Sequence, residues 1–214
     1  MSPVCKVGAV RVNYLAHLYL AGDDPESFIG SLMGDFLKGA IDHTLPPTIR
    51  HGVWLHRRVD SYTDAHPTVI NSKRRIQPEF RRYAGILVDL YYDHFLARDW
   101  SNYSDVALDD FAQAVYRIVD AHHHRFPAPM QLSMLYMTET SLLQSYRELS
   151  GIERALRGVE TRLKRPSRLR EAIVDLEHNH SALAEDFATF FPDLVLYARQ
   201  LDQRQQKLLF DFPR

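Results

Sequence analysis

Cysteine and long apolar runs are what this sequence has least of. Cys5 is the single cysteine in 214 residues, which excludes an internal disulfide framework and a zinc site built from several thiolates. No uninterrupted apolar stretch approaches the roughly 18 residues that a membrane-spanning helix needs. The first ten residues are too weakly apolar for a secretory signal peptide. These absences predict a cytoplasmic protein that binds no membrane.

Signals for β-strands are also missing. The chain has no sustained alternation of apolar and polar residues and no Asn-Gly or Asp-Gly hairpin turn. Apolar residues recur instead at helical spacing, as at Phe28, Leu32 and Phe36. Hydrophobic residues make up 45% and charged residues 25% of the chain, which is ordinary for a globular domain. The sequence therefore predicts an all-α fold, a compact bundle of several helices.

Prolines and capping residues predict where these helices begin and end. Asp24-Pro25 is typical of an N-cap followed by proline at the first helical position. Pro67 disfavours helical geometry at the residue before it, so a helix is expected to end there. No internal repeat or low-complexity linker divides the chain, so we expect residues 13–214 to form a single domain and residues 1–12 a disordered extension. The predicted helices cover residues 13–20, 25–39, 46–64, 78–100, 105–122, 130–149, 151–165, 167–191 and 192–209.

Charge is distributed unevenly, although the net charge is only −1. Residues 50–82 contain eight basic and three acidic side chains, whereas residues 171–193 contain six acidic and no Lys or Arg side chains. Such clustering is typical of a solvated helix surface or of a face that steers a charged partner. The chain lacks a known nucleic-acid motif, so we expect an acidic protein partner and no nucleic acid.

Aspartate and histidine gather on the predicted helices in a pattern typical of a metal site. His56 and Asp60 are four residues apart and so share one face of a helix, and Asp89 and Asp93 repeat this spacing. Asp35 lies among apolar neighbours. Imidazoles and carboxylates without thiolates suit Mn²⁺, Mg²⁺, Fe²⁺ or Zn²⁺, and an excess of carboxylates favours the harder ions. A pair such as His56 and Asp60 alone is more often a surface contact on a helix than a metal site, so the prediction rests on the combined set.

In these same segments the chain resembles the bacterial acyl carrier protein phosphodiesterase family. The resemblance runs from residue 13 to about 196 through four blocks in order, NYLAHLYLA, SLMGDFLKG, HRRVDSYTDAHP and DLYYDHFLARDW. It implies an HD-type phosphohydrolase fold that uses a divalent cation, with Mn²⁺ favoured over Mg²⁺ or Fe²⁺. It also implies hydrolysis of the phosphodiester that joins 4′-phosphopantetheine to a serine of holo-acyl carrier protein. The order of histidines and aspartates departs from the usual HD pattern, because Asp93-His94 reverses the His-Asp pair.

The metal and catalytic roles that we assign combine this resemblance with the spacing. Four residues are expected to hold the metal: Asp35, His56, Asp60 and Asp93. Three are expected to act in catalysis: His94 as a further ligand or as proton donor to the leaving serine oxygen, Arg57 as a bidentate phosphate ligand, and Asp89.

A second set of residues is expected to contact the substrate and its carrier protein. His17 and Arg58 are placed beside the site. Five basic residues form the expected docking surface for the acidic carrier protein: Lys73, Arg74, Arg75, Arg81 and Arg82. Two alternatives stay open, an HD-type nucleotide phosphohydrolase and a helical adaptor without enzymatic activity that binds an acidic protein.

Overall fold

The protein is described by a computed structural model over residues 14–161, 163 and 167–211, so the expectation of a disordered extension over residues 1–12 lies outside the described residues. Within these ranges the all-α prediction is confirmed, since helices are joined by turns and no strand occurs. None of these helices is both long and apolar enough to span a bilayer.

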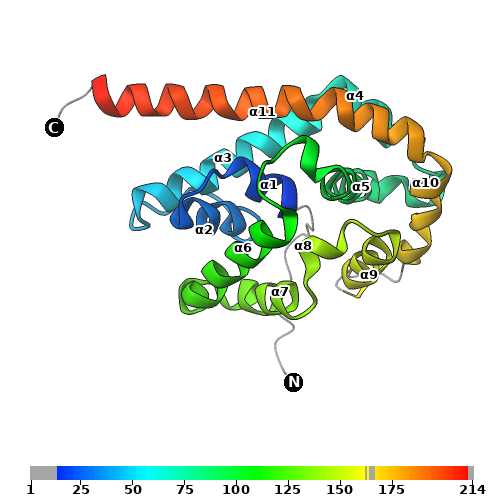
Figure 1. Ribbon diagram of the computed structural model, residues 1–214, viewed down its shortest axis with the longest axis horizontal. Coiled ribbons are helices and arrows are strands. Elements are labelled where there is room, and N and C mark those ends of the chain that lie inside the picture. The colour runs from blue at the N-terminus through cyan, green and yellow to red at the C-terminus, as the bar shows by residue number, and fades with distance from the viewer. Residues whose placement is uncertain (1–13, 162, 164–166, 212–214) are drawn as a thin grey trace.

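The helices follow one another with short connections. The α-helices are α1 (Tyr14–Leu20), α2 (Pro25–Met33), α3 (Pro47–Ala65), α4 (Pro67–Arg75), α5 (Ala84–Arg98), α6 (Leu108–His122), α7 (Ala128–Glu139), α8 (Leu142–Ser145), α9 (Leu149–Glu160), α10 (Ile173–His178) and α11 (His180–Asp211). Short 3₁₀ helices η1 (Pro78–Tyr83), η2 (Trp100–Asn102), η3 (His123–Arg125) and η4 (Leu169–Ala172) lie between them. In Figure 1, α11 spans the whole length of the molecule above α3 and α5, and α6 to α9 lie below.

Helix α5 forms the centre of the core because it is apolar on nearly every side. Leu87, Leu90, Tyr91 and Phe95 are fully buried, as expected of a helix surrounded by other helices. It packs against α1, α4, α9 and α11. Polar side chains on α5 are therefore forced into the interior, and the structure has to provide each of them with a partner.

Helices α2 and α3 approach so closely that their backbones touch. A Cβ atom at Gly30 would lie 2.3 Å from the carbonyl oxygen of Ile49, and one at Gly52 would lie 2.7 Å from that of Ser27. Glycine at both positions therefore allows the two helices to meet without intervening side chains. This contact brings the C-terminal end of α2 against the middle of α3.

Several helix predictions were wrong: α4 was not predicted, and the helices predicted over 130–149 and 167–191 are each divided into shorter ones. Two further differences have a clear physical reason or a distinct geometry. Pro192 was expected to start a new helix but lies inside α11. Helix α11 continues because apolar residues on both sides of the proline, Phe191 and Leu194 among them, are buried against the core, which outweighs the missing backbone hydrogen bond. Residues 78–83, expected as the first turns of a long α-helix, form the 3₁₀ helix η1 instead.

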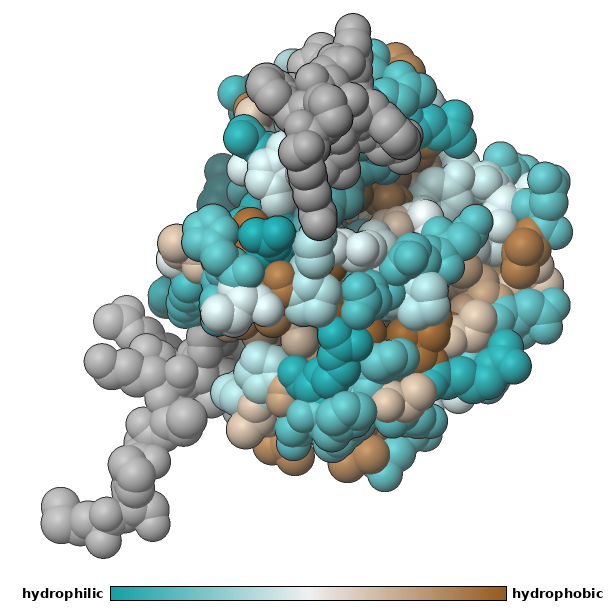
Figure 2. Space-filling view, turned by 90° about the vertical axis from the view of Figure 1, so that its left-hand side faces the viewer, coloured by the Kyte–Doolittle hydropathy of each residue, from teal (hydrophilic) through white to brown (hydrophobic). Residues whose placement is uncertain are grey.

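The surface is largely polar. Figure 2 shows one face of the molecule on which hydrophilic side chains predominate and hydrophobic ones are scattered. Few large apolar side chains are exposed among the described residues, and the most exposed is Leu132 on α7. Isolated side chains of this kind are normal on a globular protein.

Candidate metal centre

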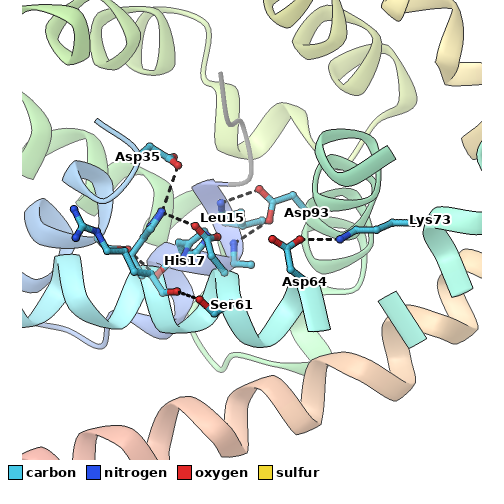
Figure 3. Close-up of polar contacts among 12 residues, drawn as sticks. Leu15, His17, Asp35, Ser61, Asp64, Lys73 and Asp93 are labelled. Carbon is cyan, nitrogen blue, oxygen red and sulfur yellow. Dashed lines mark hydrogen bonds and ion pairs between the residues drawn. The ribbon is translucent and has the colours of Figure 1, made fainter. Parts of the chain in front are cut away.

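Four polar side chains from three parts of the fold meet beside the contact between α2 and α3. His56 and Asp60 come from α3, His17 comes from α1, and Asp35 comes from the turn that follows α2. His17 Nε2 lies 3.2 Å from Asp60 Oδ1. His56 Nε2 lies 3.4 Å from Asp35 Oδ1 and 3.4 Å from Asp60 Oδ2. Figure 3 shows Asp35 and His17 pointing toward this common centre.

The imidazole of His56 lies between two carboxylates, which form 3.4 Å ion pairs with its Nε2 instead of hydrogen bonds of ordinary geometry. Both of its ring nitrogens are buried, and neither makes a hydrogen bond. A buried polar atom without a partner is costly. Ligand atoms that share one ion at bonds of about 2.1 Å lie roughly 3 to 4 Å apart. The 3.4 Å separations at Nε2 fit shared coordination better than they fit a direct hydrogen bond.

The two imidazoles at the centre have opposite pKa shifts. Burial opposes the charged form of His56, but Asp35 and Asp60 outweigh it and raise the pKa of His56 to about 9. Burial lowers the pKa of His17, and the neighbouring His56 lowers it further. Asp60 is partly buried, yet His17 and His56 hold its pKa well below the usual range. The rings of His17 and His56 stack with centroids 3.9 Å apart, so a positive charge on one opposes a charge on the other.

Gly34 leaves the space that the His56 ring occupies. A Cβ atom at Gly34 would lie 2.3 Å from Cγ and 2.4 Å from Cδ2 of that ring. Gly34 itself has ordinary right-handed helical backbone angles, φ −51° and ψ −38°. Glycine is therefore required here by the close approach of the imidazole and not by the backbone conformation. The Gly34-Asp35 pair thus provides the space and a carboxylate for the same histidine.

These donors fit a divalent cation. The ligand atoms of His17, His56 and Asp60 lie within 4.8 Å of one another, and Asp35 Oδ1 adds a second carboxylate beside His56. Two imidazoles with two carboxylates suit Mn²⁺, Fe²⁺ or Zn²⁺. Asp60 is the most exposed of the four, with 17% of its side chain accessible, compared with 5% or less for the others. The centre therefore opens to solvent on the side of Asp60.

Asp93, expected as a ligand, has a different position. Its two carboxylate oxygens accept hydrogen bonds of 2.9 Å from the backbone N–H groups of Leu15 and Ala16, which belong to the first turn of α1 (Figure 3). Burial raises the pKa of Asp93 to about 8, against the effect of these two donors. The structure does not bring Asp93 into the cluster. Asp93 instead fixes the start of the helix that carries His17. Asp89, one turn earlier on α5, acts electrostatically on Asp93 and is not in the cluster either.

His94 points away from the centre. Its Nδ1 lies 2.8 Å from the carbonyl oxygen of Tyr146, and its ring contacts those of Phe95 and His180. Burial lowers the pKa of His94, which favours the neutral ring over the charged form that a proton donor requires. Because Asp93 and His94 are adjacent on a helix, their side chains diverge by about 100°. The geometry therefore supports neither of the two roles expected for His94.

The two arginines next to His56 also differ from expectation. Arg57 donates to the carbonyl oxygens of Gly39 and Leu37 at 2.7 and 2.8 Å, so part of its guanidinium is engaged by the protein. Arg58 is exposed and lies over the ring of Trp54, 5.6 Å from its centroid. Two positions after His56 on a helix, Arg58 points to roughly the opposite side. Neither side chain is directed at the centre as a phosphate ligand.

The five residues of the expected docking surface lie on α4 and η1. Two of them form ion pairs, Lys73 with Asp64 at 2.7 Å and Arg75 with Asp186 at 3.2 Å. Arg81 donates to backbone carbonyls of residues 74 and 76. Arg74 contacts a neutral amide, and Arg82 lies over the ring of Tyr83. Uncompensated positive charge is therefore concentrated on part of the predicted surface.

Sequence reasoning placed His17 beside the substrate, whereas the structure places it within the cluster. No spacing in the sequence connects His17 with His56, because the two residues meet only through the packing of α1 on α2 and of α2 on α3. The contact between Gly34 and His56 was also missed. A glycine immediately before a buried aspartate is the only sequence signal that pointed to it.

Comparison with known proteins gave consistent matches over most of the chain. Residues 12–194 match a family model described as acyl carrier protein phosphodiesterase. Proteins with this name from Enterobacter sp. (strain 638) and Yersinia pestis are each 33% identical over 189 residues, which cover 88% of this chain and 98% of the relative. The protein of that name from Escherichia coli O157:H7 is 34% identical over 192 residues, 87% of this chain and 97% of the relative. No solved structure matches the chain.

Proposed function

The chain belongs to the acyl carrier protein phosphodiesterase family, a family of phosphodiester hydrolases, and on that premise we propose a specific reaction for it. The protein hydrolyses holo-acyl carrier protein to apo-acyl carrier protein and 4′-phosphopantetheine, using a divalent cation held by His17, His56, Asp60 and Asp35. The observation that carries the proposal is the convergence of two imidazoles and two carboxylates, in which the buried His56 Nε2 lies 3.4 Å from carboxylate oxygens of both Asp35 and Asp60.

The donor set favours Mn²⁺, with Mg²⁺ and Fe²⁺ as alternatives. Two carboxylates and two imidazoles combine hard oxygen with borderline nitrogen ligands, a mixture suited to Mn²⁺ and Fe²⁺. A bound cation of this type supplies a water molecule of lowered pKa and neutralises charge on a phosphoryl oxygen. Asp35 and Asp60 contribute the negative charge that holds the cation, and the stacked rings of His17 and His56 restrict its position.

In the proposed hydrolysis, water attacks phosphorus and the bond from phosphorus to the serine oxygen breaks. The serine oxygen takes up a proton, and the phosphoryl group leaves on the pantetheine product. The reaction requires positioning and charge neutralisation more than covalent chemistry from the protein. Because the centre opens at Asp60, the phosphodiester reaches it from the side of α3 on which Asp60 lies.

The carrier protein docks, in this proposal, on the basic surface of α4 and η1. Acyl carrier proteins are acidic, and an oppositely charged surface steers such a partner. Lys73 and Arg75 already have carboxylate partners. Among the described residues, no carboxylate forms an ion pair with Arg74, Arg81 or Arg82. These three arginines therefore provide most of the free charge.

Mass spectrometry of holo-acyl carrier protein incubated with the enzyme and Mn²⁺ tests the reaction directly. The expected result is loss of the phosphopantetheine group, which stops when EDTA is added. Asp60→Ala is expected to lower turnover by at least about 100-fold, consistent with the range for outright loss of a catalytic electrostatic group. Asp110→Ala, which removes an exposed carboxylate on α6 outside both the proposed centre and the proposed docking surface, is the control.

Unchanged holo-acyl carrier protein in this assay would overturn the proposed reaction. Turnover of nucleotides in a parallel panel would then favour a nucleotide phosphohydrolase. Full activity of Asp60→Ala, or activity that survives complete removal of divalent ions, would overturn the proposed metal centre. Circular dichroism shows whether each variant keeps its helices, so that a folding defect is not taken for lost chemistry.

A further inference from the structure

Asp35 is the one member of the metal centre that is not anchored on a helix. Helix α2 ends at Met33, and the backbone continues as a turn in which Phe36 and Leu37 donate to the carbonyl oxygen of Met33 at 2.9 and 3.0 Å. The chain is then exposed at residues 38–40 and reaches α3 only at Pro47. Asp35 nonetheless has to hold a carboxylate oxygen 3.4 Å from His56 Nε2.

Arg57 on α3 forms two hydrogen bonds with the backbone of this segment. Its Nη2 donates to the carbonyl oxygen of Leu37 at 2.8 Å, and its Nη1 donates to that of Gly39 at 2.7 Å. Both distances are short for N–H···O bonds, as expected when the donor is charged. Gly39 has a φ of +77°, a conformation that glycine adopts without strain. The planar guanidinium thus bridges two carbonyl groups, two and four residues beyond Asp35.

Arg57 directly follows His56 on α3, so the ligand and the bridging side chain share one rigid support. Gly34 packs against the ring of His56, and Leu37 and Gly39 are fixed by Arg57. Asp35 lies between these two points of attachment. A carboxylate between two fixed points has little freedom to leave the centre.

We propose that Arg57 is a positioning residue that latches the turn of residues 34–39 to α3 and thereby keeps Asp35 at the metal centre. This inference rests on the proposed metal-dependent function. It replaces the expectation that Arg57 binds the substrate phosphate. The two roles predict different results. Loss of a latch changes the mobility of residues 34–39 in the metal-free protein and the affinity for the metal, whereas loss of a phosphate ligand changes only the affinity for the substrate.

Arg58 provides a matched control for the change of charge. It is the neighbouring residue, it has the same side chain, and it is exposed over Trp54. It makes no hydrogen bond to the turn of residues 34–39 within the described part of the chain. Arg57→Ala and Arg58→Ala therefore change net charge equally and differ in the contact with the turn.

The first measurement is hydrogen–deuterium exchange of the metal-free protein. The amides of Phe36 and Leu37, which are hydrogen-bonded to the carbonyl oxygen of Met33, are expected to exchange at least about threefold faster in Arg57→Ala than in the parent, and at the parental rate in Arg58→Ala, because loss of the bridge releases the turn that protects them. Parental exchange rates in Arg57→Ala would overturn the latch. This readout does not depend on metal binding, so it remains decisive if the proposed metal centre fails.

The second measurement is the affinity for Mn²⁺ by calorimetry. Loss of a residue that orients a metal ligand typically weakens binding by about 10- to 100-fold, and we expect this for Arg57→Ala but not for Arg58→Ala. Arg57→Lys keeps the charge without the planar fork, so it should also bind Mn²⁺ more weakly than the parent. Parental Mn²⁺ affinity in Arg57→Ala, with a raised KM for holo-acyl carrier protein, would return Arg57 to substrate binding. A parental protein that binds no Mn²⁺ would instead contradict the proposed function.

Discussion

At the scale of single residues, the metal centre depends on which atoms carry protons. Two imidazoles stacked at 3.9 Å cannot both be charged without strong repulsion. The carboxylates of Asp35 and Asp60 raise the pKa of His56, whereas burial lowers that of His17. The metal-free protein at neutral pH therefore has a charged His56 and a neutral His17. Only the neutral form of an imidazole can bind a metal, so the cation has to displace one proton from His56.

The first prediction is that Mn²⁺ binding releases about one proton at pH 7. The pKa of His56 is about 9, so below that pH the proton competes with the metal, and the apparent affinity should rise about tenfold per pH unit as pH increases. Calorimetry at pH 7 in buffers of different ionisation enthalpy counts the protons, and titrations between about pH 6.5 and 8 give the slope. Binding that is independent of pH over this interval would contradict the assignment of His56 as a ligand.

At the scale of helices, the centre exists because glycines let two helices touch. Gly30 and Gly52 bring the backbones of α2 and α3 together, and the end of α2 then meets His56. The remaining support comes from α5, whose Asp93 caps α1 at Leu15 and Ala16. An N-terminal cap of this type contributes about 1 kcal/mol in many proteins. Here it also sets the position of His17, which directly follows Ala16.

The second prediction concerns Gly34→Ala. The backbone at Gly34, the C-cap of α2, has right-handed helical angles that alanine adopts without strain. The new Cβ atom would overlap the ring of His56, so His56 must move away from Asp35. We expect Mn²⁺ affinity to fall by at least about 10-fold, in the range found when a metal ligand loses its orientation, while circular dichroism still shows a helical protein.

Gly158→Ala is the control for this substitution. A Cβ atom at Gly158 in α9 would approach only the hydroxyl of Tyr136, at 3.9 Å, which is an ordinary contact. This variant should bind Mn²⁺ like the parent and should be equally or slightly more stable. If Gly34→Ala also bound Mn²⁺ like the parent, the close contact between Gly34 and the ring of His56 would not be needed for metal binding.

Contacts within one helix could be predicted from the sequence, whereas contacts between helices could not. The pair His56 and Asp60 was predictable because their spacing is a property of one helix. His17 was expected beside the site and not as one of the metal ligands, and Gly34 was given no role, because their contacts with His56 arise only when α1, α2 and α3 pack. The spacing of Asp89 and Asp93 was real, but spacing alone does not show what a helix faces, and Asp93 faces the start of α1. Helix boundaries failed where tertiary burial outweighed local preference, as at Pro192.

At the scale of the whole molecule, the proposed metal centre and the proposed docking surface carry opposite charges and lie on different helices. The metal centre gathers carboxylates from α2 and α3, whereas the free arginines lie on α4 and η1, which follow α3 in the chain. Lys73 is held by Asp64, one turn beyond Asp60 on α3, at the border between these two regions. An acidic partner attracted by the arginines would thus be brought near the open side of the centre.

The last prediction tests recognition without disturbing the centre. Arg74→Glu combined with Arg82→Glu reverses two charges that have no carboxylate partner among the described residues. Arg81 is left intact because it holds the connection between α4 and η1 through backbone carbonyls. Exposed charge pairs each contribute up to about 1 kcal/mol, so KM for holo-acyl carrier protein should rise by roughly 3- to 30-fold and kcat should stay close to the parental value.

Salt and a control charge reversal distinguish docking from a general change in net charge. The parental KM should increase with ionic strength because salt screens the attraction, and this dependence should weaken in the double variant. Arg117→Glu, an exposed reversal on α6, should leave KM and its salt dependence almost unchanged, and Mn²⁺ affinity should be parental in both variants. Arg117→Glu changes the net charge by half as much as the double variant, so a rise of KM in Arg117→Glu that is about half as large on a logarithmic scale would show that the partner responds to the total charge of the protein and not to a surface on α4 and η1. The carrier protein would then have to reach Asp60 from another side.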